Sequence, residues 1–193
     1  MVLDMAKKKY EFRPDSETTS FFSRFHLTVT QRRGLLQGSL FALVLLVLSL
    51  LQDVILSRFR IFGVTSDLVP CAIILICVIR GSEKGCVFTL VAAALYQFSG
   101  GPGYYVILLL PLLSLLAAMF RQGYLHTTAL TAMVCTALTV VLYQLGVFGV
   151  CLLLGRTYAG RIGQFLLTAA LSLVAVPILY PLCRAIDRLG GEV

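Results

Sequence analysis

Residues 67–103 read DLVPCAIILICVIRGSEKGCVFTLVAAALYQFSGGPG: two short apolar stretches separated by a charged turn and followed by a glycine loop. The first stretch ends at Ile79, and the second runs from Cys86 to Phe98. Each holds about 12 to 15 residues, so as a helix it extends roughly 20 Å through a hydrocarbon core about 30 Å thick. Helices this short fit best as a hairpin within a bundle of longer membrane spans.

The composition excludes an ordinary soluble domain. Of the 193 residues, 59% are hydrophobic and only 13% are charged, about half the charge that the surface of a soluble domain needs. The formal net charge of +7 comes from basic residues that flank apolar stretches. Such residues orient a chain in the lipid bilayer. We therefore expect an integral membrane protein and no nucleic-acid partner.

Four longer apolar stretches surround the hairpin, at residues 34–56, 104–120, 130–154 and 164–183. Together with the hairpin they predict an all-α integral membrane bundle of six transmembrane helices. The predicted organisation is a basic cytoplasmic tail at 1–33, a transmembrane domain at 34–189 and a short tail at 190–193. The first tail is either a docking segment for a cytoplasmic partner or a solvated segment beside the membrane.

Basic residues predict the orientation of this bundle. With six spans, twelve Lys and Arg residues fall on the side of the two termini and four on the other side. Because positively charged loops stay in the cytoplasm, both termini are expected there, in a multi-pass protein of the cytoplasmic membrane. The glycine loop at 100–103 then faces outward.

The sequence contains no recognisable catalytic motif. The patterns HExxH, GxSxG and the P-loop are absent, and neither His26 nor His126 has an acid or nucleophile nearby in a known motif. The six cysteines form no CxxC pair and lie in or beside apolar stretches, as is typical of reduced, packed thiols. We expect no enzyme activity, no metal site and no cofactor.

Polar and small residues gather on the predicted outer side. They are candidates for binding a partner or lining a recess: Asp53, Asp67, Pro70, Tyr96, Gln97, Gly100, Gly101 and Tyr104. In one interpretation they only turn the chain and satisfy a neighbouring backbone. In the other, the short helices leave an outward recess that holds a small ligand or a partner's transmembrane helix.

Four glycines are candidates for helix packing. Gly34 and Gly38 form a GxxxG pair in the first span, and Gly146 and Gly149 lie in the fifth. Glycine leaves bare backbone on a helix face, so a neighbouring helix can approach closely.

The order of these elements resembles the MreD family, the multi-span rod shape-determining membrane proteins of bacteria. The resemblance covers roughly residues 35–189. It is carried by Gln52-Asp53 at the end of the first span, SDLVP at 66–70, Arg80-Gly81, LYQFSGG at 95–101 and PILYPL at 177–182. Two positions depart from the family pattern: Gln97 stands where the family often has aspartate, and Asp67 precedes the proline instead of following it.

The resemblance implies a non-enzymatic scaffold of the cell-wall elongation (rod) complex in the bacterial cytoplasmic membrane. Its partner would be an MreC-like bitopic membrane protein, and through it MreB, RodA and a class-B penicillin-binding protein, which together drive peptidoglycan synthesis and maintain cell shape. The resemblance also implies a bundle like the substrate-binding subunits of ECF-type vitamin transporters. Such a small-molecule transporter subunit is the alternative function.

Overall fold

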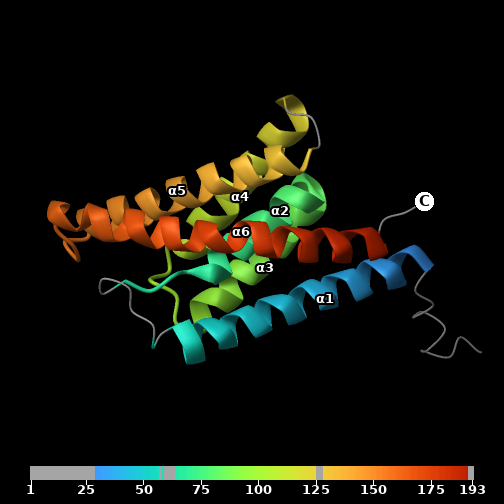
Figure 1. Cartoon of the computed structure of the whole chain (residues 1–193), viewed down its shortest axis with the longest axis horizontal. Coiled ribbons are helices and arrows are strands. Elements are labelled where there is room, and N and C mark those ends of the chain that lie inside the picture. Colours follow the sequence, from blue (N-terminus) through green and yellow to red (C-terminus); the bar gives the residue numbers. More distant parts are fainter. Residues whose placement is uncertain (1–28, 57, 59–63, 125–127, 191–193) are drawn as a thin grey trace, which may run out of the picture.

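The computed structural model describes residues 29–56, 58, 64–124 and 128–190, and within these ranges it contains helices and no strands. The element order is α1 (Val29–Leu51), the π-helical turn η2 (Gln52–Leu56), α2 (Leu68–Arg80), α3 (Ser82–Phe98), α4 (Val106–Tyr124), α5 (Ala129–Leu153), the 3-10 turn η3 (Ala159–Arg161) and α6 (Ile162–Gly190). The predicted all-α class is confirmed (Figure 1).

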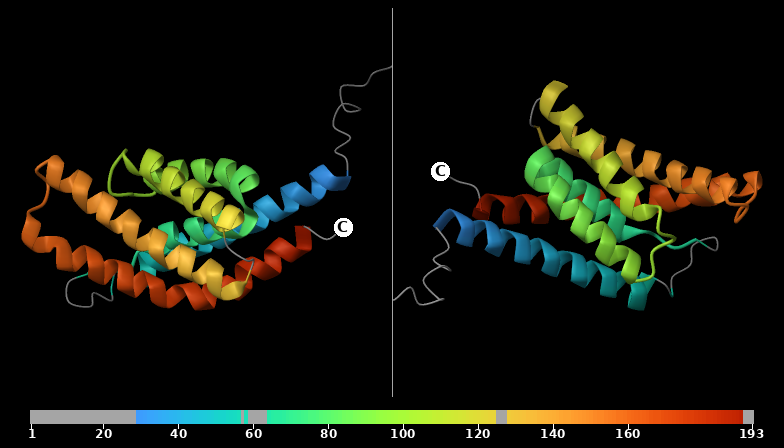
Figure 2. Two further views of the ribbon diagram at one scale, coloured as in Figure 1. Left: turned by 90° about the horizontal axis from the view of Figure 1, so that it is seen from above. Right: turned by 180° about the vertical axis from the view of Figure 1, so that it is seen from behind.

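Helix α2 is the centre of the bundle. Every residue from Leu68 to Val78 is buried, and α2 contacts α1, α3, α4, α5 and α6. Its sequence is apolar all round, and a helix without a polar face is stable only when other elements surround it. Figure 2 shows α2 and α3 lying within the length of the longer helices.

Four helices are long and apolar enough to cross a membrane: Gly34–Val54, Val106–Gly123, Ala129–Leu153 and Ala159–Arg188. These helices fit a multi-pass membrane protein. Helix α2 has 13 residues and α3 has 17, so α2 extends about 20 Å, less than the thickness of the hydrocarbon core.

The predicted turn at residues 80–85 is wrong, because a single residue separates α2 from α3. Gly81 reverses the chain with φ +86°, a conformation that favours glycine. Ser82 already begins α3. The charged residues Glu83 and Lys84 therefore lie in the first turn of a helix and not in the predicted turn between helices.

Two other predicted boundaries also differ from the structure. The last helix continues past Cys183 to Gly190, with Pro177 and Pro181 inside it. Proline is tolerated within membrane helices because neighbouring groups satisfy the freed carbonyl, so this proline pair does not end the helix. The first helix begins at Val29, five residues before the predicted span. Residues 1–28, including most of the predicted tail, lie outside the described ranges.

The start of α1 and the end of α6 lie at the same end of the bundle (Figures 1 and 2). A polar cluster joins them there. The Gln37 amide donates to Asp187 Oδ1 at 2.8 Å, and Arg80 Nη2 donates to Gln37 Oε1 at 3.2 Å. The Arg80 guanidinium also lies over the Phe41 ring, 5.4 Å from its centroid. Helices α1, α2 and α6 are thus tied together by one buried glutamine that the sequence analysis did not single out.

Replacing Gln37 with leucine is expected to weaken the attachment of α1. The variant loses the three hydrogen bonds of the Gln37 side chain, two to Asp187 and one from Arg80. Arg80 and Asp187 are left without their shared partner, a loss of about 1–3 kcal/mol in the free energy of unfolding. Thermal unfolding of the purified protein in detergent measures the effect. Ser39→Ala is the matched control, because the Ser39 hydroxyl is exposed and donates to Leu36 O of its own helix. Equal stability of the two variants would contradict the role of Gln37.

Candidate functional site

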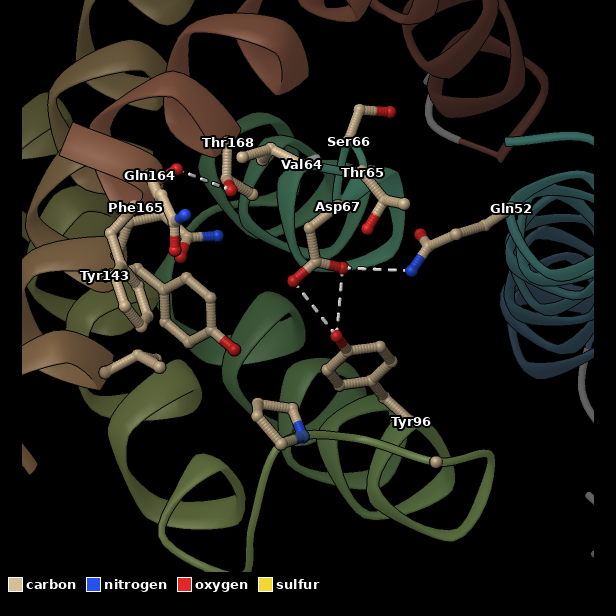
Figure 3. A pocket seen from close by; sticks show the side chains of 14 residues that line it. Gln52, Val64, Thr65, Ser66, Asp67, Tyr96, Tyr143, Gln164, Phe165 and Thr168 are labelled. Atoms are coloured by element: carbon tan, nitrogen blue, oxygen red, sulfur yellow. Dashed lines mark hydrogen bonds between the residues drawn. The ribbon is translucent and has the colours of Figure 1, made fainter. Parts of the chain in front are cut away.

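A polar pocket of about 410 Å³ opens at the end of the bundle opposite the start of α1. Residues from η2, α3, α5 and α6, together with the segments before α2 and before α4, line it. Asp67 lies at its centre, directly before α2 (Figure 3). The pocket therefore lies over the N-terminus of the buried helix.

Side chains from other elements cap α2. The first backbone N–H groups of a helix have no partner within that helix. Gln52 Oε1 accepts from the N–H of Leu68 at 2.9 Å and from that of Val69 at 3.1 Å. Pro70 has no N–H, and the N–H of Asp67 donates to Ser172 Oγ at 2.9 Å. The capping role that a residue such as Asp67 often fills is taken by Gln52, which leaves the Asp67 carboxylate available for other contacts.

The Asp67 carboxylate accepts hydrogen bonds from two neighbouring elements. The Tyr96 hydroxyl lies 2.9 Å from Oδ1 and 3.0 Å from Oδ2, and Gln52 Nε2 lies 3.1 Å from Oδ1. Burial raises the pKa of the Asp67 carboxyl above its ordinary value, although hydrogen bonds from Tyr96, Gln52 and Gln144 act to lower it. Burial therefore disfavours the ionised form of this carboxyl, and a cation placed beside it would favour that form.

Helices α5 and α6 form the opposite wall of the pocket. Tyr143 and Gln144 come from α5, and Gln164, Phe165 and Thr168 come from α6. Only 1% of the Tyr143 side chain is exposed, and its hydroxyl has no hydrogen-bond partner among the described residues. Figure 3 shows this hydroxyl pointing into the pocket. An unsatisfied buried hydroxyl is uncommon and calls for an explanation.

The structure brings together three of the eight residues that the sequence analysis proposed for a recess. Asp67, Tyr96 and Gly100 line the polar pocket. Asp53 lies at the same end of the bundle but lines a different cavity, between α1 and α3. Tyr104 is 83% exposed and does not line the polar pocket.

The other three proposed residues have structural positions beside the pocket. Pro70 is buried in the first turn of α2. Gln97 Oε1 is buried without a hydrogen-bond partner among the described residues. A Cβ added to Gly101 would lie 2.9 Å from that oxygen. The loop therefore passes so close to Gln97 that position 101 favours glycine.

Most of the opposite wall was not predicted from the sequence. Tyr143, Gln144, Gln164 and Phe165 were not proposed as lining residues. The sequence does contain one indication of this wall, since Tyr143 and Gln144 are adjacent polar residues inside a mainly apolar span. A polar pair within a span is costly unless it faces a partner or a cavity.

The four glycines proposed for helix packing have few close neighbours in the described structure. A Cβ added to Gly34, Gly38 or Gly149 would meet no atom within 4 Å, and one added to Gly146 would lie 3.1 Å from Leu109 Cδ2. Gly34 and Gly38 thus leave bare backbone available to a second molecule. Among the glycines inside helices of the described structure, Gly85, which was not proposed, has the closest neighbour, since an added Cβ would lie 2.9 Å from the Cys77 carbonyl oxygen.

A second cavity of about 450 Å³ lies between α1 and α3 and is lined mainly by apolar side chains, including Leu46, Phe88, Val91 and Leu95. We call it the lateral groove. At one end, the hydroxyls of Ser49 and Ser99 lie 3.3 Å apart and join the two helices.

The polar pocket offers one carboxylate, several hydroxyls and several amides. It is therefore equipped to bind a ligand through hydrogen bonds and charge. Among the described residues, no three His, Cys, Asp or Glu side chains are grouped so that they could hold a metal ion. All six cysteines are free thiols. No family model, curated protein or solved structure matches the chain.

Proposed function

We propose that this chain is a non-enzymatic scaffold of the bacterial cell-wall elongation complex. It binds an MreC-like bitopic protein in the cytoplasmic membrane and thereby links MreB, RodA and a class-B penicillin-binding protein to peptidoglycan synthesis. The proposal comes from the resemblance of residues 35–189 to the MreD family. The described structure supports it by offering a surface suited to a partner helix.

The observation that carries the proposal is the poor burial of α1. Only 11% of the residues in the most apolar window of this span are buried, against 28%, 33% and 28% in the other three candidate spans. Large side chains on α1 stay exposed, among them Leu43, Leu46 and Leu50, and the last two line the lateral groove. The first span is thus held along only part of its surface and leaves the rest for another molecule.

The lateral groove suits a single apolar helix. Lipid chains are as apolar as leucine, so helices associate in a membrane by close packing and not by avoiding water. A concave groove provides more packing contact than a flat helix face. The transmembrane helix of a bitopic partner is therefore the occupant that we propose for it.

The proposal includes six crossings, with α2 and α3 as short spans, and both termini in the cytoplasm. Four or six crossings both place the two termini on one side. The start of α1 and the end of α6 lie together at one end of the bundle, which is consistent with either number. The distribution of basic residues favours the cytoplasm for that end.

Depletion of this protein from a rod-shaped bacterium that carries it is expected to round the cells. Wild-type protein should restore the cell width, and Leu95→Trp should not, because the indole fills the lateral groove and displaces the partner helix. Val174→Trp is the matched control, since Val174 is an exposed apolar residue of α6 that does not line the groove. Microscopy measures the width.

Co-purification gives the second measurement for the same variants. The bitopic partner should be recovered with the wild-type protein and with Val174→Trp, and lost with Leu95→Trp. Unchanged cell width after clean depletion would rule out the scaffold. Normal width with Leu95→Trp would leave the scaffold standing and rule out the lateral groove as its binding surface.

The polar pocket favours a second candidate, the substrate-binding subunit of an ECF-type small-molecule transporter. Its 410 Å³ volume falls in the range of small-ligand sites, about 300–1,000 Å³. This function requires an energising module that co-purifies with the chain. Recovery of such a module, with no effect of depletion on cell shape, would favour it over the scaffold.

A further inference from the structure

We infer that the pocket around Asp67 binds a small organic ammonium ion that also carries a hydroxyl group. The inference names the ligand class for the second candidate function. It concerns the chain alone, so it does not depend on the scaffold or on the lateral groove. Three features of the described pocket support it: its charge, its aromatic walls and the unsatisfied Tyr143 hydroxyl.

The charge of the pocket selects for cations. Asp67 is the only charged side chain among the fourteen lining residues. The remaining polar contacts come from neutral amides and hydroxyls, such as those of Gln144 and Thr168. An anion would enter this partly buried space against the charge of Asp67, with no basic lining residue to compensate. A cation would be attracted there more strongly than in water.

Aromatic rings make an organic cation a better fit than a small inorganic one. Tyr96, Tyr143 and Phe165 all line the pocket and come from three different helices. The faces of aromatic rings attract ammonium groups, and quaternary ammonium ligands are commonly recognised by several such rings together. A carboxylate within an aromatic wall is the combination that such a ligand needs.

The Tyr143 hydroxyl is the reason that the proposed ligand carries a hydroxyl group in addition to its ammonium group. It is buried, points into the pocket and has no partner among the described residues. The Tyr96 hydroxyl, by contrast, already donates to Asp67. A ligand hydroxyl that pairs with Tyr143 would satisfy a buried polar atom of this wall that has no partner among the described residues.

The test compares choline with 3,3-dimethylbutan-1-ol, which has the same shape but a carbon in place of the charged nitrogen. Ethanolamine and benzyltrimethylammonium extend the comparison to a smaller and a larger ammonium ion. Binding to the purified full chain in detergent is measured by calorimetry and by thermal shift at constant ionic strength. At least one ammonium ion should bind, and choline should bind about tenfold or more tightly than its neutral analogue.

Variants connect the binding to the pocket. Asp67→Asn should weaken ammonium binding about tenfold or more, because the amide keeps the shape and removes the charge. Asp53→Asn is the matched control, since Asp53 lies at the same end of the bundle but lines the lateral groove. Tyr143→Phe should weaken binding of the hydroxyl-bearing choline several-fold and leave benzyltrimethylammonium unaffected. This variant also tests the site if Asp67→Asn does not fold.

Several outcomes would overturn the inference. These are no binding by any of the three ammonium ions, equal binding of choline and its neutral analogue, or an equal thermal shift with sodium ions alone. Unchanged choline binding in a folded Asp67→Asn variant, or in Tyr143→Phe, would do the same. None of these results would bear on the scaffold, because its test uses the bitopic partner and the lateral groove.

Discussion

Replacing Gly85 with leucine is expected to separate α3 from α2 and to lower the free energy of unfolding by about 3 kcal/mol or more. A Cβ at this position would lie 2.9 Å from the Cys77 carbonyl oxygen, 3.0 Å from its Sγ and 3.1 Å from its Cα. Two of these atoms belong to the backbone of α2, which is surrounded by other helices and cannot move aside. The added side chain must therefore push the two helices apart.

The effect should be large because the whole inner face of α3 is built from small residues. Its buried residues are Gly85, Thr89, Ala92 and Ala93. Spaced at three or four positions, they form one stripe along which α2 and α3 approach closely, as small residues allow in membrane helices. A bulky residue at one end of the stripe also weakens the contacts that follow it.

Denaturant and thermal unfolding in detergent, with size-exclusion chromatography to detect aggregation, measure this effect. Gly149→Leu is the matched control, because Gly149 also lies inside a helix and has no neighbouring atom within 4 Å of its added Cβ. It should leave the stability nearly unchanged, within about 0.5 kcal/mol. If Gly85→Leu is as stable as this control, the close contact between α2 and α3 is not the main one that holds the hairpin.

Replacing Gln52 with leucine is expected to lower the free energy of unfolding by about 2–4 kcal/mol. The change removes the acceptor for the N–H groups of Leu68 and Val69 and one donor to Asp67. Each buried donor left unsatisfied costs free energy, and Leu68 and Val69 are both buried. The N-terminus of the central helix would lose its cap.

Gln164→Leu is the control for this prediction. It makes the same chemical change at the edge of the same pocket, on an exposed residue. Its effect on thermal unfolding should be small. A Gln52→Leu variant as stable as Gln164→Leu would mean that other groups, such as water in the pocket, cap α2 equally well.

Part of the candidate site could be expected from residues 67–100. Asp67, Tyr96 and Gly100 stand at the ends of predicted spans on one predicted side, and the structure brings them together. Gln52 lines the same pocket but was not among the proposed residues. The direct contacts could not be foreseen. The Gln52 side chain caps the start of α2, because the π-helical turn that begins at Gln52 lies beside it.

The far wall of the pocket and the contacts between helices were harder to predict, because both depend on which helix faces meet. In a membrane helix nearly every position is apolar, so hydrophobic periodicity does not indicate which face meets another helix. A GxxxG pair at Gly34 and Gly38 looked like the packing face, whereas among the described helical glycines it is Gly85 that lies against a neighbouring helix most closely. Residues that lie far apart in the chain, such as Tyr96 and Tyr143, meet only through the arrangement of the helices.

The sequence alone determined that this chain is helical and apolar, and that its two shortest apolar stretches, separated by a charged turn and followed by a glycine loop, form a hairpin. Composition and the lengths of the apolar segments can be read directly from the sequence, because neither depends on how the helices pack. Only the tertiary structure decided that α2 is surrounded on all sides, that Gln52 caps it and that Asp67 shares a pocket with Tyr143. Those features depend on which helix faces meet, and uniformly apolar faces carry little local information about their partners.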